Sequence, residues 1–262
     1  MGSATTQALA ASIQTLAAAN GVTLETAREL FAAAQAIGES SQLSGALADP
    51  AAPAAARQNV VSAVFSGLSE NTRTVLKTVV TERWSNADEL IDGIDELAIR
   101  AATIADSSAD IEGELFGFSR VVASNPELEL ALGSRLGGRD AKAALIDRLL
   151  AGTTSAPAAL IVSSMVRQPR ERRIRQLLSR AMRIVSDQRD RVVATVYSAS
   201  ALNDAQRARL ADALSRRYGG EIALNVVIDP TVLGGLRVQI ADDVIDGSIA
   251  ARLADLRQKL AG

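Results

Sequence analysis

The sequence contains no cysteine and no histidine among its 262 residues. These absences exclude thiol nucleophiles, disulfides, zinc sites built from Cys or His, and acid–base chemistry by an imidazole. Aromatic residues make up only 3% of the chain, so alanine and the aliphatic residues must fill the cores. That bias favours helices. No run approaches the roughly 18 consecutive apolar residues that would span a bilayer. Few classes of enzyme are compatible with this composition, and we expect no metal and no cofactor.

The charge of the chain is nearly balanced but unevenly distributed. Its formal net charge of −2 points neither to nucleic acid nor to an anionic membrane as a general partner. Residues 1–105 carry 6 basic and 11 acidic side chains, residues 106–191 carry 14 and 11, and residues 192–262 carry 8 of each. The start of the chain, Met1 to Ala4, lacks the basic and apolar regions of a secretory signal. We therefore expect an intracellular protein with three electrostatically distinct segments.

From Ala4 to about Ile184 the apolar residues follow helical spacing. Leu9, Ile13 and Leu16 form one stripe of a first helix, and Thr23 is the expected N-cap of a second. The pattern predicts further helices over residues 54–65, 70–84 and 86–104. Short connections are expected at the helix breakers Gly38, Gly45, Asp49-Pro50 and Pro53. Short helices joined by short loops favour an antiparallel bundle.

The pattern of residues 29–76 recurs at an offset of 85. Glu29-Leu30-Phe31 matches Glu114-Leu115-Phe116, and Val75-Leu76 matches Leu160-Ile161, without a gap between them. The matches loosen beyond residue 80, where the register can differ by one or two positions. The sequence therefore predicts that a helical bundle is duplicated within the chain.

Beyond Arg191 the periodicity changes to that of an α+β unit. Alternating or β-branched runs predict strands over residues 192–197, 222–228 and 236–240. A helix capped by Asn203 or Asp204 is expected between the first two strands, and a terminal helix over residues 249–260. The predicted fold class is thus mainly α. It comprises two tandem antiparallel helical bundles, residues 1–105 and 106–191, followed by a small C-terminal α+β unit, residues 192–262.

Charged clusters are the other notable features. The Arg-rich run from Arg167 to Arg175 could track phosphates of a nucleic acid, or it could be a solvated junction between helices. No aromatic residue is interleaved with it, which favours the junction. The acidic stretch from Asp88 to Glu96 is interpreted as a solvated helix face. Asp242, Asp243 and Asp246 lack the ligand spacing of a calcium loop and are interpreted as turn and cap residues.

One C-terminal segment carries a specific resemblance. Val227-Ile-Asp-Pro-Thr-Val-Leu-Gly-Gly-Leu-Arg-Val238, followed by Asp242-Asp-Val-Ile-Asp-Gly-Ser-Ile249, resembles the delta subunit of bacterial ATP synthase, the family of the oligomycin-sensitivity-conferring protein. The match departs at Ala241, where the family has glycine, and the family's opening helix is only echoed at Gln7 to Ala11. Ordinary members carry one helical bundle, so two bundles resemble the long actinobacterial form.

The resemblance implies a non-catalytic stator subunit of the F-type proton-translocating ATP synthase. Such a subunit would link the N-terminal helices of the alpha subunits to subunit b of the peripheral stalk and resist rotary torque. It would lie on the cytoplasmic face of the plasma membrane, as a peripheral protein with no membrane span and no nucleic acid. The alternative is a soluble helical adaptor or regulator that binds nucleic acid through residues 167–175.

The expected partner-binding residues follow from the resemblance and from the apolar stripes of the predicted helices. A groove for a partner helix is expected along Ala158 to Val166 and along its counterpart, Thr72 to Val80. Trp84 is interpreted as a partly buried packing residue, with an interface anchor as the alternative. The stalk contact is expected between Leu236 and Leu260. The candidate residues are Val75, Val79, Trp84, Leu160, Ser164, Arg167, Gly234, Gly235, Asp246, Gly247, Leu253 and Leu256.

Overall fold

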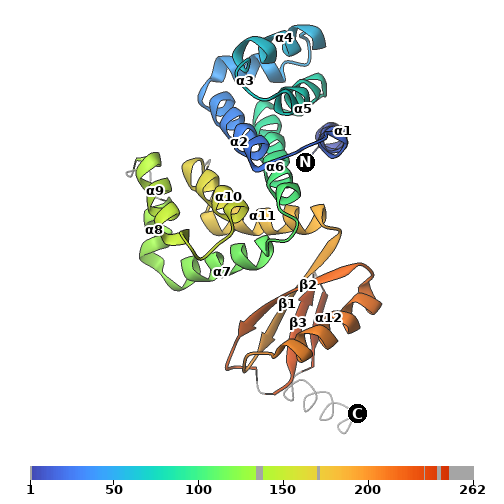
Figure 1. Ribbon diagram of the computed structural model, residues 1–262, viewed down its shortest axis with the longest axis vertical. Helices are drawn as coiled ribbons and strands as arrows, with labels where there is room; N and C mark the ends of the chain where they lie inside the picture. Colours follow the sequence, from blue (N-terminus) through green and yellow to red (C-terminus); the bar gives the residue numbers. More distant parts are fainter. Residues whose placement is uncertain (1, 134–137, 170–171, 233, 241–242, 248–262) are drawn as a thin grey trace, which may run out of the picture. The chain divides into compact units, whose positions relative to one another are not determined.

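A computed structural model describes the whole chain except residues 1, 134–137, 170–171, 233, 241–242 and 248–262. The described residues form two compact units, one up to Val185 and one from Ser186 onward. The first is entirely helical, and the second contains a four-stranded sheet with a helix (Figure 1). The prediction of a mainly α chain, with helical bundles followed by a small α+β unit, is confirmed.

The first six helices of the helical unit form a bundle. They are α1 (Ser3–Ala18), α2 (Leu24–Glu39), α3 (Ser41–Ala48), α4 (Ala54–Val64), α5 (Glu70–Thr81) and α6 (Ala87–Ala105). Thr23 caps α2 through a reciprocal capping box with Thr26, as its place before an apolar stripe predicts. Helix α3 spans the expected connection at Gly45, because Ser40 supplies an N-cap whose hydroxyl accepts from the Leu43 backbone N–H.

The same order of helices then recurs. The second set is α7 (Ile111–Ser124), α8 (Pro126–Gly133), α9 (Arg139–Leu150), α10 (Ala156–Arg167) and α11 (Ile174–Gln188). Counted from their first residues, these helices lie 85 to 87 residues after the helices α2 to α6, and α6 itself begins 84 residues after α1. Helix α6 packs against α1, α2, α3 and α5, and also against α10. It therefore occupies the last position of the first set and the first position of the second.

A hydrogen bond repeats between the two sets and fixes their register. The Glu29 carboxylate on α2 accepts from the backbone N–H of Ser69, the N-cap of α5, at 2.9 Å. The Glu114 carboxylate on α7 accepts from the backbone N–H of Ser155, the N-cap of α10, at 3.0 Å. The glutamates are 85 residues apart and the caps 86, so one residue is added between α7 and α10. When the N-caps Ser69 and Ser155 are aligned, the counterpart of Val75 is Ile161 rather than its neighbour Leu160.

The C-terminal unit is built around the strand β1 (Arg191–Ser198). Helix α12 (Asp204–Tyr218) connects it to β2 (Glu221–Ile228), which is parallel to β1. The strands β3 (Leu236–Ile240) and β4 (Asp243–Asp246) add antiparallel on the other side, giving the order β2-β1-β3-β4. Strand β4 corrects the expectation of three strands, since four residues are too few to produce a recognisable alternation. Alternate residues of the sheet, including Ala194 and Val196, form a core with Leu214 of α12.

Candidate partner-binding cleft

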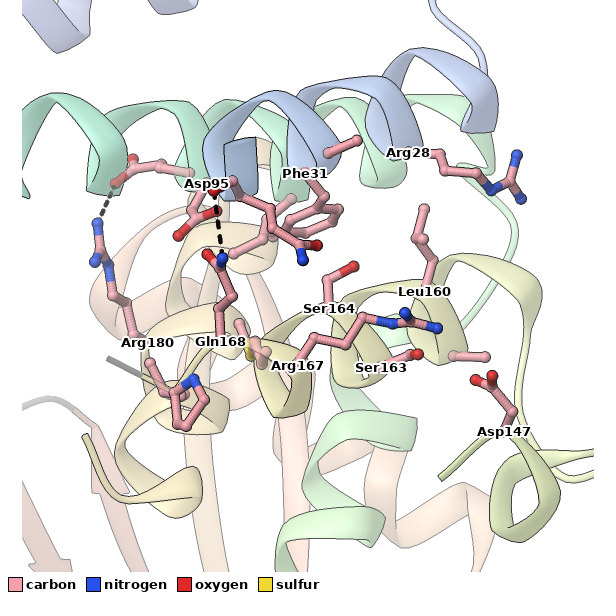
Figure 2. A pocket seen from close by; sticks show the side chains of 18 of the residues that line it. Arg28, Phe31, Asp95, Asp147, Leu160, Ser163, Ser164, Arg167, Gln168 and Arg180 are labelled. Atoms are coloured by element: carbon pink, nitrogen blue, oxygen red, sulfur yellow. Dashed lines mark hydrogen bonds and ion pairs between the residues drawn. The ribbon is translucent and has the colours of Figure 1, made fainter. Parts of the chain in front are cut away.

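A cleft of about 540 Å³ lies within the helical unit, and three of the predicted site residues line it. Leu160, Ser164 and Arg167 all lie on α10, at the spacing of one helical stripe. Figure 2 shows them facing α2 across the cleft. The fold therefore brings these three predicted residues of α10 together on one wall of the cleft.

The opposite wall of the cleft is α2, which the sequence reasoning did not select. Its lining residues are Leu24, Arg28, Phe31, Ala32 and Gln35. The side-chain amide of Gln168 donates to the backbone carbonyl of Gln35 at 3.4 Å and joins the two walls at one end. Arg28 and Leu160 lie at the other end (Figure 2). The stripe on α2 was visible in the sequence, but nothing in the sequence indicated that it would face α10.

Helix α6 contributes Asp95, Glu96 and Ile99 to the cleft, and its acidic residues correct an expectation. Asp92 and Glu96 are buried rather than solvated, with 9% and 6% of their surfaces exposed. Asp92 forms ion pairs with Arg172 and, at 3.3 Å, with Arg180. Glu96 pairs with Arg100 of its own helix at 2.8 Å. The basic partners on the α11 side come 80 residues or more later, so local charge spacing could not reveal them.

These pairs also bear on the Arg-rich run. Arg172 pairs with Asp92, and Arg175 pairs with Glu129 at 3.0 Å. Two of the described arginines of the run are thus neutralised by carboxylates of the same chain, which reduces the phosphate contacts that the run can offer. The arrangement is that of a helix junction fastened by ion pairs.

Val75, Val79 and Trp84 lie in the core of the first set of helices. The two valines have no exposed surface, and Trp84 is 4% exposed. The Trp84 indole N–H donates to the Val79 carbonyl at 2.7 Å, and its ring lies against Gly93 of α6. These residues support the bundle from within, so we do not include them in the surface that a partner could touch.

In the C-terminal unit, the predicted glycines serve the turns around β3. Gly234 and Gly235 have φ angles of 67° and 79°, which favour glycine. The Gly247 N–H donates to the Leu236 carbonyl at 2.8 Å, and an added Cβ would lie 3.2 Å from that oxygen. Asp246 is exposed at the end of β4. Leu253 and Leu256 lie outside the described residues.

Along the described part of the chain, no group of three or more acidic side chains is arranged to hold a metal ion. No helix there combines the length and the apolar character needed to cross a membrane. The described residues thus present a mainly helical fold, a cleft between α2 and α10 lined by apolar and charged side chains, and ion pairs at the helix junctions.

Comparison with known proteins identifies the family. The sequence model of the ATP synthase delta (OSCP) subunit family matches residues 7–107 and, a second time, residues 96–260. The ATP synthase subunit delta of Leifsonia xyli subsp. xyli is 45% identical over the full length of both chains. That of Kineococcus radiotolerans is 40% identical over 91% of this chain and 88% of its own, and that of Streptomyces avermitilis 38% over 91% and 89%.

The chain belongs to the ATP synthase delta (OSCP) subunit family. It is therefore a non-catalytic stator subunit of the F-type ATP synthase, and its partners are implied to be in that complex. The two family matches overlap at residues 96–107, within and just after α6. This overlap agrees with a helix that serves both copies.

Proposed function

We propose that this subunit connects the alpha subunits of the catalytic head to subunit b of the peripheral stalk and holds the head against rotary torque. The observation that carries the proposal is the cleft lined by Leu160, Ser164 and Arg167, because an apolar groove between helices suits the apolar face of a partner helix. The proposed occupant is the amphipathic N-terminal helix of an alpha subunit. The C-terminal α+β unit, around Gly234 to Gly247, is the proposed contact for subunit b.

The location follows from these partners. A stator subunit that reaches both the head and the stalk would be peripheral, on the cytoplasmic face of the plasma membrane. Affinity purification of the tagged chain from gently solubilised native membranes tests this. We expect alpha, beta and b-type subunits to be recovered with it in fixed ratios. Recovery of the chain alone, or with nucleic acid, would contradict the proposal.

A calorimetric titration tests the cleft itself. A synthetic peptide with the N-terminal sequence of the alpha subunit from the same organism is titrated into the full chain. Leu160→Gln places a polar group in the cleft and is expected to weaken binding about tenfold. Leu145→Gln is the matched control, since Leu145 is 42% exposed on α9 and does not line the cleft. Equal affinities of the two variants would exclude the cleft as the alpha-binding site.

A further inference from the structure

The two walls of the cleft come from different copies of the duplicated bundle. Helix α2 lies only within the first family match and α10 only within the second, while residues 96–105 of α6 lie in both. We propose that the partner helix is held between the two copies, with α2 as an obligatory wall, so that neither copy forms the site alone. This inference rests on the proposed function and names a part of the site that a single bundle would lack.

The length of the walls argues for a helical occupant. On α2 the lining runs from Leu24 to Gln35, and on α10 from Ala156 to Arg167. Each stripe thus covers 11 residue steps, or about 16 Å, which is three helical turns. A lining of this kind on two facing helices matches one face of a third helix of about the same length.

The apolar side chains of the walls indicate how the occupant sits, with its apolar stripe inserted between α2 and α10. Phe31 and Leu160 face this space from opposite walls, and Ile99 lines it from α6.

The charges at the rim indicate what flanks the apolar stripe. Each wall carries an arginine, Arg28 on α2 and Arg167 on α10, while the carboxylates Asp95 and Asp147 lie on α6 and α9. The ion pair of Arg28 with Glu25 is more than half exposed on both sides and so contributes little. Arg28 can therefore turn to a partner at low cost. A partner helix with acidic residues on the two sides that contact α2 and α10 would complement these arginines.

Charge reversal on α2 tests the inference in the full chain, with the alpha-subunit peptide as the probe. Arg28→Glu is expected to weaken peptide binding about tenfold, and by more at low salt than at high salt. Arg120→Glu makes the same change on α7, where Arg120 is exposed and does not line the cleft, and should stay within twofold of the wild type. Thermal unfolding by circular dichroism checks that both variants are folded.

The outcomes separate the inference from the proposed function. If Arg28→Glu has no effect while Leu160→Gln weakens binding, the second copy binds the partner alone and the inference is wrong. Tighter binding by Arg28→Glu would mean that the partner presents basic residues to α2, which overturns the acidic flank inferred for the occupant. If neither variant changes binding, the cleft is not the site and both proposals fall. A photoreactive group on the apolar face of the peptide should label residues 24–35 as well as 156–167, and labelling of 156–167 alone would contradict a shared site.

Discussion

Single side chains explain why the duplication was visible in the sequence. The match of Glu29-Leu30-Phe31 with Glu114-Leu115-Phe116 places a glutamate where its carboxylate accepts from the N-cap of a later helix, Ser69 or Ser155. The serine hydroxyls also donate to these carboxylates, at 2.5 and 2.6 Å. One acidic residue therefore stabilises a helix start 40 residues further along, and both copies keep this arrangement.

Glu29 gives a prediction about pH. Burial alone would raise its pKa, but hydrogen bonds from Ser69 and Thr72 outweigh burial and lower the pKa below the ordinary value. A carboxyl whose pKa is lower in the folded state stabilises the fold above its unfolded pKa, and this contribution is lost as the pH falls through the folded pKa. Glu29→Gln should therefore lower the free energy of unfolding at pH 7. The difference from the wild type should shrink as the pH falls below about 4.3.

Urea unfolding at a series of pH values, followed by Trp84 fluorescence, measures that difference. A constant difference between Glu29→Gln and the wild type from pH 7 to pH 3 would show that the carboxylate form is not what these hydrogen bonds favour.

Gly93 gives a second prediction at this scale. A Cβ at this position would overlap the ring of Trp84, whose indole is held by its hydrogen bond to Val79. Gly93→Ala is therefore expected to destabilise the protein by about 1–3 kcal/mol through overpacking. Gly117 on α7 is the matched control, because nothing lies within 4 Å of an added Cβ. Gly117→Ala should be neutral or should stabilise by up to about 1 kcal/mol. Equal stabilities in urea would refute the packing argument.

At the scale of the element, periodicity predicted most helices and strands but not the pairing of charges. The expected helices at residues 54–65 and 86–104 correspond closely to α4 and α6. Apolar spacing reports which face of a helix is buried. Apolar spacing does not reveal that Asp92 and Glu96 are buried, because the arginines that pair with them, Arg172 and Arg180, come 80 or more residues later in and just before α11.

The cleft was predictable in part for the same reason. Three residues of α10 that line it, Leu160, Ser164 and Arg167, lie on or beside the stretch Ala158 to Val166, whose apolar stripe predicted a groove for a partner helix. The wall that α2 supplies was not found. Its stripe also mixes Leu24 and Phe31 with Arg28 and Gln35, but which helix faces which is decided by packing between the copies. A single sequence contains no direct record of that packing.

The ion pairs between α6 and the α11 side give a prediction about an element. Asp92 and Arg180 have side chains only 12% and 19% exposed. Asp92 also pairs with Arg172, and Arg180 with Glu96, so removing Asp92 takes a carboxylate from two arginines at once. Asp92→Ala is expected to cost about 3–5 kcal/mol. Removing both partners should cost less than the sum of the single changes. A double-mutant cycle with Arg180→Ala in urea measures this coupling.

The surface pair of Glu25 and Arg28 serves as the control for that cycle. Both side chains are more than half exposed, and Glu25→Ala should change stability by less than about 1 kcal/mol. Additive effects of Asp92→Ala and Arg180→Ala would mean that the two side chains do not act as a pair.

At the scale of the whole molecule, the two copies of the duplicated bundle share one helix, α6. The helical unit has eleven helices where two separate six-helix copies would need twelve, in the part of the chain that the structure describes. Helix α6 accounts for the difference, and thirteen of its nineteen residues are buried. A boundary between two bundles at residue 105 would assign α6 to the first copy alone. Its contact with α10 instead makes each copy part of the other's core.

This arrangement predicts that residues 1–185 unfold as one cooperative unit. Leu115 on α7 belongs to the second copy and has no exposed surface. Leu115→Ala should cost about 2–5 kcal/mol. If α6 ties the copies together, slow hydrogen exchange should accelerate to the same extent in α2 and α5 of the first copy as in α7 and α10. Leu214→Ala, a matched change in the α+β unit, should leave exchange in residues 1–185 unchanged. Faster exchange confined to α7–α11 would mean that the copies unfold separately, and that α6 holds them side by side without making them one domain.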